Sequence, residues 1–454
     1  MGEPSSQICD VAIIGGGCSG VLVAARLLRG GFEGSVVIVE ERSELGRGLA
    51  YSTPFQQHLL NVPARGMSAC PSQPTHFVDW LRSNYPSASP DCFVPRSVYG
   101  GYLKDFLLAA ERSNERAALR HVRNEVIDIH TVGSEVDLIL RDQSRIRAAK
   151  VVLAVGNPQS SPAGHSGANR WASPWDEGAL QVRHLGERIL LIGTGLTAVD
   201  SALALLSSKH PCSVFMLSRR GLLPQAHTPA IPRTASLAID EAQGLRRLTK
   251  ELRAHVRASR ETGACWRAIV DGLRSDSNRI WQKFSIADRK RFLRHLKPYW
   301  ETHRHRMAPE IARALQQFRA QNKIEVIAGR VRDVDIQNGA TALRILLRGA
   351  GERSLRVDRV INCTGIQDNF FHSCRPLIRT LVEKGMAKPH PLGVGLETDE
   401  LGALLNAEGE VSSSLFTLGP PRSGHLLETT AVPELRVQAR ALAQRLLNAP
   451  VAAY

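Results

Sequence analysis

CDVAIIGGGCSGVLVAARLL, residues 9–28, decides how the chain is expected to fold. The apolar residues up to Ile14 predict a buried strand, and the stretch after the glycines predicts a helix. Gly15, Gly17 and Gly20 stand at the G-x-G-x-x-G spacing of a strand–turn–helix unit. In such units the first glycine permits a sharp turn, the second lets a pyrophosphate approach the backbone, and the third lets helix and strand pack closely. The helix, which starts near Ser19, directs its free N–H groups at the phosphates.

The next apolar run, SVVIVE at residues 35–40, ends in Glu40, twenty residues after Gly20. A carboxylate at this distance accepts hydrogen bonds from the ribose hydroxyls of an adenosine. It disfavours a 2′-phosphate, so the unit is expected to bind FAD through Gly15, Gly17, Ser19, Gly20 and Glu40. The alternative is a glycine-rich turn in an unrelated βαβ unit.

RILLIGTGLTAVDSALALL, residues 188–206, repeats the pattern with Gly193, Gly195 and Ala198 at the three fingerprint positions. Glu40 lies 25 residues after Gly15, and Ser218 lies 25 residues after Gly193. Two arginines follow Ser218, and the planar fork of arginine suits a 2′-phosphate. This unit is therefore expected to bind NADPH, the alternative being a basic turn at the end of a strand. The residues assigned to this second site are Gly193, Gly195, Leu196, Thr197, Ser218, Arg219 and Arg220.

An FAD site and an NADPH site in one chain indicate hydride transfer from nicotinamide to flavin. The predicted fold class is α/β, with two Rossmann-like dinucleotide domains. The FAD domain is expected to be discontinuous (1–185 and 355–454) around an NADPH domain at 186–354. A basic helical insertion is expected at 236–320. Two further buried strands, in 148–158 and 358–366, end at glycines that a cofactor could approach, Gly156 and Gly365.

The composition narrows the function classes. Eight cysteines form no CxxC or CxxxxC pair, which predicts free thiols and argues against a disulfide reductase and a cysteine zinc site. The net charge is +15, and residues 244–306 hold 17 Lys and Arg against 6 Asp and Glu. Aromatic residues are only 5% and do not alternate with the basic ones, so no nucleic-acid partner is expected. No apolar run is long enough for a membrane span. A cytoplasmic location is expected, and no metal is expected.

Several further stretches carry a resemblance to known proteins, among them ELGRGLAYST, HLLNVPARGMSA, SRRGLLPQAH, WETHRHRMAP, VINCTG and GHLLETTAVPELRVQA. With the two fingerprints, they make the chain resemble a family of bacterial FAD/NAD(P)-binding proteins related to L-aspartate N-monooxygenases. More distantly, the chain is similar to the ornithine and lysine N-hydroxylating flavoenzymes. The resemblance implies that NADPH reduces FAD and that a C4a-hydroperoxyflavin passes one atom of molecular oxygen to a primary amine.

The resemblance also implies roles for residues outside the fingerprints. In two-domain flavoenzymes the region after the ribose carboxylate runs along the cofactor, which makes Gly46, Arg47, Gly48 and Tyr51 candidate flavin contacts. Asn61 is a candidate polar group at the reactive edge of the ring, or else a turn residue. By analogy, Glu428, Thr429 and Ala431 contact the pyrimidine side of the flavin, and His425 and Glu428 are candidate proton carriers.

Two enzymatic functions stay open at this point, beside a nucleotide-sensing or nucleic-acid-binding protein, which the charge of +15 permits but the two intact fingerprints oppose. The first is an N-hydroxylating monooxygenase for a small amino-acid-like amine, which the basic insertion would favour if the substrate is acidic. The second is an NADPH-dependent flavin oxidoreductase that transfers no oxygen. The sequence names neither the amine nor the oligomeric state.

Overall fold

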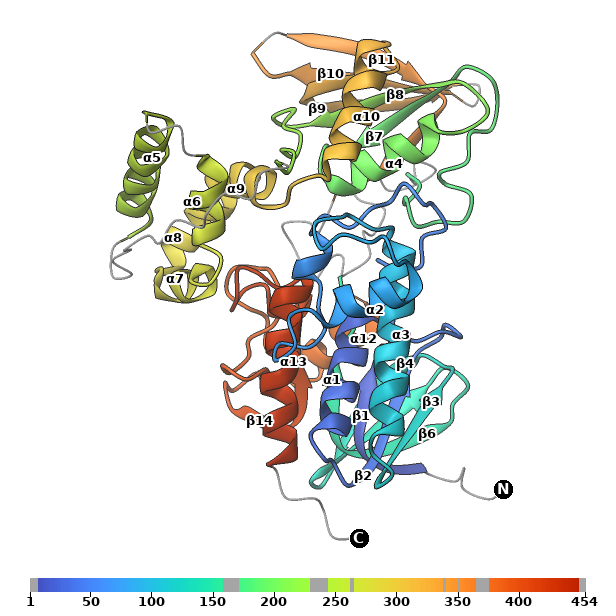
Figure 1. The fold of residues 1–454 in the computed structure, drawn as a ribbon, viewed down its shortest axis with the longest axis vertical. Helices are drawn as coiled ribbons and strands as arrows, with labels where there is room; N and C mark the ends of the chain where they lie inside the picture. The colour runs from blue at the N-terminus through green and yellow to red at the C-terminus, as the bar shows by residue number, and fades with distance from the viewer. Residues whose placement is uncertain are drawn as a thin grey trace. The chain divides into compact units, whose positions relative to one another are not determined.

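The computed structural model describes residues 7–157, 171–228, 244–261, 265–337, 340–349, 351–364 and 375–448 (Figure 1). These residues form two compact units. One contains the described residues up to 56, then 63–157 and 375–448, and the other contains 57–62 and the described residues between 171 and 364.

The first unit is built on a sheet whose strands run in the order β13-β14-β6-β1-β2-β3. Its parallel core is β1 (Gln7–Ile14), β2 (Gly34–Val39), β3 (Ala117–Val122), β6 (Arg145–Leu153) and β14 (Val411–Thr417). Three antiparallel pairs extend it: β13 (Ala403–Leu405) pairs with β14, β5 (Glu135–Leu140) pairs with β6, and β4 (Val126–Val132) pairs with β5. Ala12, Ile13 and Ile38 are buried in β1 and β2, as expected for parallel strands that are covered on both faces.

The helices of this unit are α1 (Cys18–Arg29), α2 (His76–Asn84), α3 (Arg96–Arg112), α12 (Pro376–Glu383) and α13 (Val432–Leu447). Two short turns of 3₁₀ helix, η1 (Ala64–Gly66) and η3 (Pro420–Arg422), complete it. Helix α1 packs between α3 and α13, so the first and last parts of the chain meet on one side of the sheet (Figure 1). On another side, α12 packs on β4, and Leu377 and Leu381 join the core formed by the strands.

The second unit has a sheet in the order β11-β10-β9-β8-β7-β12. Its parallel strands are β12 (Arg359–Asn362), β7 (Glu187–Ile192), β8 (Cys212–Ser218) and the start of β9 (Ile324–Gln337). An antiparallel extension follows with β10 (Ala340–Leu347) and β11 (Glu352–Val357). Helix α4 (Leu196–Leu206) connects β7 to β8, and α10 (Pro309–Ala320) leads into β9 and packs on α4.

The basic segment between β8 and α10 is helical where it is described. It comprises α5 (Leu245–Glu261), α6 (Trp266–Gly272), α7 (Ser277–Lys283), α8 (Ile286–Arg291), the π-helical turn η2 (Phe292–Leu296) and α9 (Lys297–Arg304). The predicted insertion also took in α10, but α10 is the crossover helix of the second sheet. Pro298 and Pro309 stand in the first turns of α9 and α10, where the missing N–H is not needed.

The units divide the chain differently from the predicted boundaries. The second part of the FAD domain was expected to begin at 355, which lies inside β11. Strand β12 then pairs in parallel with β7, with Asn362 opposite Ile192. The second sheet therefore includes residues up to the end of β12 at Asn362. Residues 57–62 also group with the second unit, although they were expected in the first. The assignment of FAD to one unit and NADPH to the other stays a prediction.

Candidate dinucleotide sites

Gly15 makes the turn between β1 and α1 in a conformation that favours glycine. Its φ is +105°, and a Cβ atom placed on it would lie 2.5 Å from the carbonyl oxygen of Ala154. Its N–H donates to the carbonyl of Val39 at 2.9 Å. The turn is therefore held between the ends of β2 and β6, and no side chain fits there.

The other two glycines allow the backbone of α1 to come close to its surroundings. Gly17 caps the helix in extended conformation and has no side chain to satisfy the first free N–H groups. A Cβ atom on Gly20 would lie 2.0 Å from the carbonyl oxygen of Gly15, so only glycine lets the helix pack on this turn. The free N–H groups at the start of α1 form a suitable place for a pyrophosphate.

Glu40 follows β2 directly, and its carboxylate lies at the fingerprint loop. One oxygen accepts a hydrogen bond from the Gly16 N–H at 2.9 Å, and the other accepts from the Arg42 N–H at 3.1 Å. Glu40, which lies 25 residues after Gly15 in sequence, is thus in contact with the glycine loop. This position next to the glycines is where a ribose-binding carboxylate is required.

The loop after Glu40 also returns to the fingerprint. The Gly46 N–H donates to the carbonyl of Gly16 at 2.8 Å, and the Cα of Gly48 lies 3.4 Å from a Cβ placed on Gly17. Arg47 is paired with Glu44 at 2.6 Å. Tyr51 is buried against the Tyr99 ring, and this burial raises the pKa of its hydroxyl above the usual range. The structure therefore brings the predicted flavin contacts Gly46, Arg47 and Gly48 to the first fingerprint.

The C-terminal segment reaches the same place. A Cβ on Gly419 would lie 3.3 Å from the Ser19 hydroxyl and 3.6 Å from the Thr429 carbonyl oxygen, so these residues surround one point. Glu428 and Thr429 are buried, and Ala431 caps the N-terminus of α13. Helix α13 begins directly after this segment. Gly156, at the end of the run that follows β6, has a φ of +69° and open space around it.

The second fingerprint repeats this geometry. Gly193 has a φ of +125°, and a Cβ on it would lie 2.8 Å from the carbonyl oxygen of Cys363. Its N–H donates to the carbonyl of Leu217 at 2.7 Å. Gly195 caps α4, which starts at Leu196 and Thr197, and among the described residues no atom lies within 4 Å of a Cβ placed on Gly195. A ligand can therefore approach the backbone here. Gly365 lies outside the described residues.

The two arginines after β8 differ in their surroundings. The guanidinium of Arg220 lies over the Tyr299 ring, 5.6 Å from its centre, whereas Arg219 is exposed. Ser218 accepts a hydrogen bond from the Gly221 N–H at 3.0 Å and contacts the Thr194 hydroxyl. Arg219 is thus the arginine whose side chain stands open to a ligand.

Asn61 groups with the second unit because two histidines hold its segment there. His58 Nε2 lies 3.1 Å from the carbonyl oxygen of Asp200, and His227 Nε2 donates to the carbonyl oxygen of Asn61 at 3.0 Å. Burial lowers the pKa of His227 to about 4, and Arg306 contributes to this. The catalytic roles predicted for Asn61, His425 and Glu428 stay predictions.

The basic motif HRHRMAP is occupied by contacts within the second unit. His305 pairs with Glu301 at 2.5 Å, buried Arg306 pairs with Asp271, and the His303 ring lies against Trp266. These ion pairs neutralise part of the charge that the sequence shows.

Within the described ranges, no group of three or more His, Cys, Asp or Glu could hold a metal ion, and no helix is both long and apolar enough to cross a membrane.

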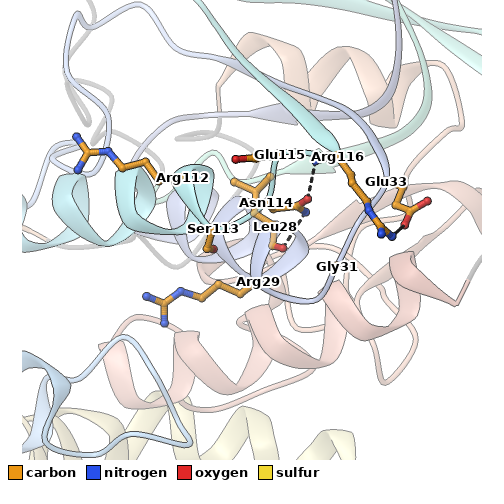
Figure 2. A pocket seen from close by; sticks show the side chains of 9 residues that line it. All are labelled: Leu28, Arg29, Gly31, Glu33, Arg112, Ser113, Asn114, Glu115 and Arg116. Atoms are coloured by element: carbon orange, nitrogen blue, oxygen red, sulfur yellow. Dashed lines mark hydrogen bonds and ion pairs between the residues drawn. The ribbon is translucent and has the colours of Figure 1, made fainter.

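A pocket of about 600 Å³ lies at the C-terminal ends of α1 and α3, and its lining includes Arg29, Asn114 and Arg116 (Figure 2). The Asn114 amide donates to the carbonyl of Leu28, and Arg116 pairs with Glu33. The fingerprint glycines lie at the opposite end of α1, about 18 Å away for a 12-residue helix. The pocket is therefore separate from the dinucleotide site.

Sequence reasoning missed two residues of the second unit, Thr194 and His227. Thr194 occupies a variable position of the fingerprint, and His227 lies 166 residues from Asn61 in sequence. Their contacts depend on how the chain folds back, so no local pattern marks them.

Comparison with known proteins supports the fold. Residues 12–158 match an FAD-NAD(P)-binding family. A flavin-containing monooxygenase of Aspergillus flavus is 28% identical over 215 residues, which cover 43% of this chain and 50% of that protein. The match thus spans half the length of this curated relative.

Solved structures match nearly the whole chain. Ornithine hydroxylase from Pseudomonas aeruginosa has a TM-score of 0.65 at 16% identity, with 97% of this chain and 99% of that chain covered. Ornithine N-hydroxylase from Kutzneria sp. 744 has 0.67 at 14% identity and the same coverage. L-lysine 6-monooxygenase from Pseudomonas syringae has 0.65 at 15%, with 96% and 99% covered. The predicted fold class is confirmed: the chain has an α/β, Rossmann-like architecture that matches flavin monooxygenase structures.

Proposed function

We propose that this protein is an FAD-dependent, NADPH-using monooxygenase that N-hydroxylates a primary amine of a small amino-acid-like substrate. One observation carries the proposal: the two fingerprints have the same geometry but opposite charges at the ribose position. Glu40 lies at the first, and exposed Arg219 follows β8 at the second. This difference separates a nucleotide with a free 2′-hydroxyl from one with a 2′-phosphate.

The residues of the first unit fit FAD. Gly15, Gly17 and the start of α1 offer free backbone N–H groups to a pyrophosphate, and Glu40 is placed for a ribose. Buried Glu428 and the N-terminus of α13 lie on the side where Gly419 meets Ser19. A helix N-terminus stabilises negative charge, which the reduced flavin carries. Bound FAD would supply the hydride acceptor and the reaction with molecular oxygen.

The second unit supplies the electron donor in this proposal. The free N–H groups of α4 face the pyrophosphate of NADPH, and Arg219 binds its 2′-phosphate. A guanidinium can form two parallel hydrogen bonds with a phosphate.

Solved structures with the same fold support the proposal of an amine substrate, because their names give ornithine, lysine and cadaverine as amines that those proteins act on. An acidic amino acid such as aspartate is a further candidate, because the chain carries a net charge of +15. Asn61, His425 and Glu428 are the candidates for orienting the amine or moving its proton.

The test is NADPH consumption by the FAD-loaded protein with ornithine, lysine, cadaverine and aspartate, each followed by mass spectrometry of the amine. We expect one amine to gain a single oxygen atom, with one hydroxylamine formed for each NADPH consumed. If NADPH is consumed at the same rate without amine and all of the reducing power appears as hydrogen peroxide, the protein is a flavin oxidoreductase without oxygen transfer.

A further inference from the structure

Thr194 stands between the first two glycines of the second fingerprint, yet its side chain turns to the chain after β8. The residue is buried, 6% exposed. Its hydroxyl oxygen lies 2.9 Å from the Ser218 hydroxyl oxygen and 2.6 Å from the carbonyl oxygen of Leu222. One side chain thus contacts both ends of the five-residue segment 218–222.

These hydrogen bonds connect four groups. The Thr194 hydroxyl donates in both contacts, so its single proton is shared between the Ser218 hydroxyl oxygen and the Leu222 carbonyl oxygen. Ser218 also accepts from the Gly221 N–H at 3.0 Å. A chain of hydrogen bonds thus joins Gly221, Ser218, Thr194 and Leu222.

The two arginines lie between the residues that these hydrogen bonds join. Gly221 has a φ of +60°, and a Cβ on it would lie 3.1 Å from the Cβ of Ala328, so the segment turns tightly there. Arg220 is held over the Tyr299 ring. Arg219 is exposed. The backbone of Arg219 is therefore fixed while its side chain is available.

We propose that Thr194 is a positioning residue for cofactor specificity. Its hydroxyl holds the 218–222 turn in the conformation from which Arg219 reaches the 2′-phosphate. This inference rests on the proposed function, in which the second unit binds NADPH. Without the hydroxyl, the turn must be ordered when the nucleotide binds, and that ordering lowers affinity. The loss falls on the contact to the 2′-phosphate, which NAD⁺ does not make.

The matched variants are Thr194→Val, which keeps the branched shape but removes the hydroxyl, and Thr194→Ser, which keeps the hydroxyl. The readout is the dissociation constants of NADP⁺ and NAD⁺ for the FAD-loaded protein, measured by calorimetry, so no turnover is required. For Thr194→Val we expect NADP⁺ to bind about 3- to 10-fold more weakly, within the range for one ordinary hydrogen bond. NAD⁺ binding stays unchanged, and Thr194→Ser behaves like the wild type.

Wild-type protein and Arg219→Ala separate the two ways to fail. If wild type binds NADP⁺ and NAD⁺ equally, the proposed reading of the 2′-phosphate is wrong. If wild type prefers NADP⁺ and Arg219→Ala loses that preference while Thr194→Val keeps it in full, the role of Thr194 is wrong. Equal weakening of both nucleotides by Thr194→Val also overturns that role. Should Thr194→Val fail to fold, Ser218→Ala breaks the same chain of hydrogen bonds and is judged by the same results.

Discussion

Acidification should destabilise the second unit through His227. Burial lowers the pKa of His227 to about 4, Arg306 and Arg267 lower it as well, and the hydrogen bond to Asn61 and the charge of Asp271 oppose them. An unfolded histidine has a pKa of about 6.5. Between these two values the unfolded chain binds a proton that the native protein does not, so stability falls as the pH falls through this window.

The size of the effect follows from the shift. A difference of about 2.5 pKa units corresponds to at most about 3 kcal/mol, of which about 2 kcal/mol is lost at about pH 5. The full loss is reached only below the native pKa of about 4. The hydrogen bond to the Asn61 carbonyl needs only an N–H donor, so His227→Gln preserves it without a titrating group.

The assay is urea unfolding of the FAD-loaded wild type and of His227→Gln, at about pH 7.5 and about pH 5. The chain has 15 histidines, so the comparison between the two proteins is what isolates His227. We expect the wild type to lose about 2 kcal/mol more than the variant over this range. Equal losses in the two proteins, or an NMR titration of the His227 ring near its ordinary pKa, would refute the reasoning.

Two further predictions concern stability and cofactor binding. Gly15→Ala should purify with little FAD, because its Cβ would lie 2.5 Å from the Ala154 carbonyl oxygen. Gly31→Ala should keep its flavin, because its φ is also positive (+79°) but no described atom lies within 4 Å of the added Cβ. Equal flavin content in the two variants would contradict this. Arg359→Met leaves buried Glu187 unpaired and should lower the free energy of unfolding by about 3–5 kcal/mol. Arg353→Met, which removes a surface pair, should cost about 1 kcal/mol or less, and similar losses for both would be the contrary result.

The sequence was sufficient to predict both βαβ units. Their apolar strands, glycine spacing and the 25-residue interval to Glu40 and Ser218 are local features, and the structure places Glu40 on the first turn. The end of the NADPH domain was not predictable, because β12 joins β7 through pairing of residues about 170 positions apart. Such pairing depends on the whole sheet rather than on the composition of a window.

The segment 57–62 shows the same limit at the candidate site. Its place in the second unit depends on hydrogen bonds from His58 and His227 to partners 142 and 166 residues away. The sequence also did not show which basic residues are neutralised. Arg306 is buried against Asp271, and His305 is paired with Glu301, through contacts that the motif HRHRMAP does not reveal.

Anaerobic reduction of the bound flavin tests most directly the claim that electrons pass from NADPH in the second site to FAD in the first. The FAD-loaded protein is mixed with NADPH or NADH without oxygen, and the loss of oxidised-flavin absorbance is followed. We predict reduction at lower concentrations of NADPH than of NADH, and a rise in the half-saturating NADPH concentration of about 10- to 100-fold in Arg219→Ala, with NADH unaffected. No reduction by NADPH, or equal effects of Arg219→Ala on both donors, would contradict the claim.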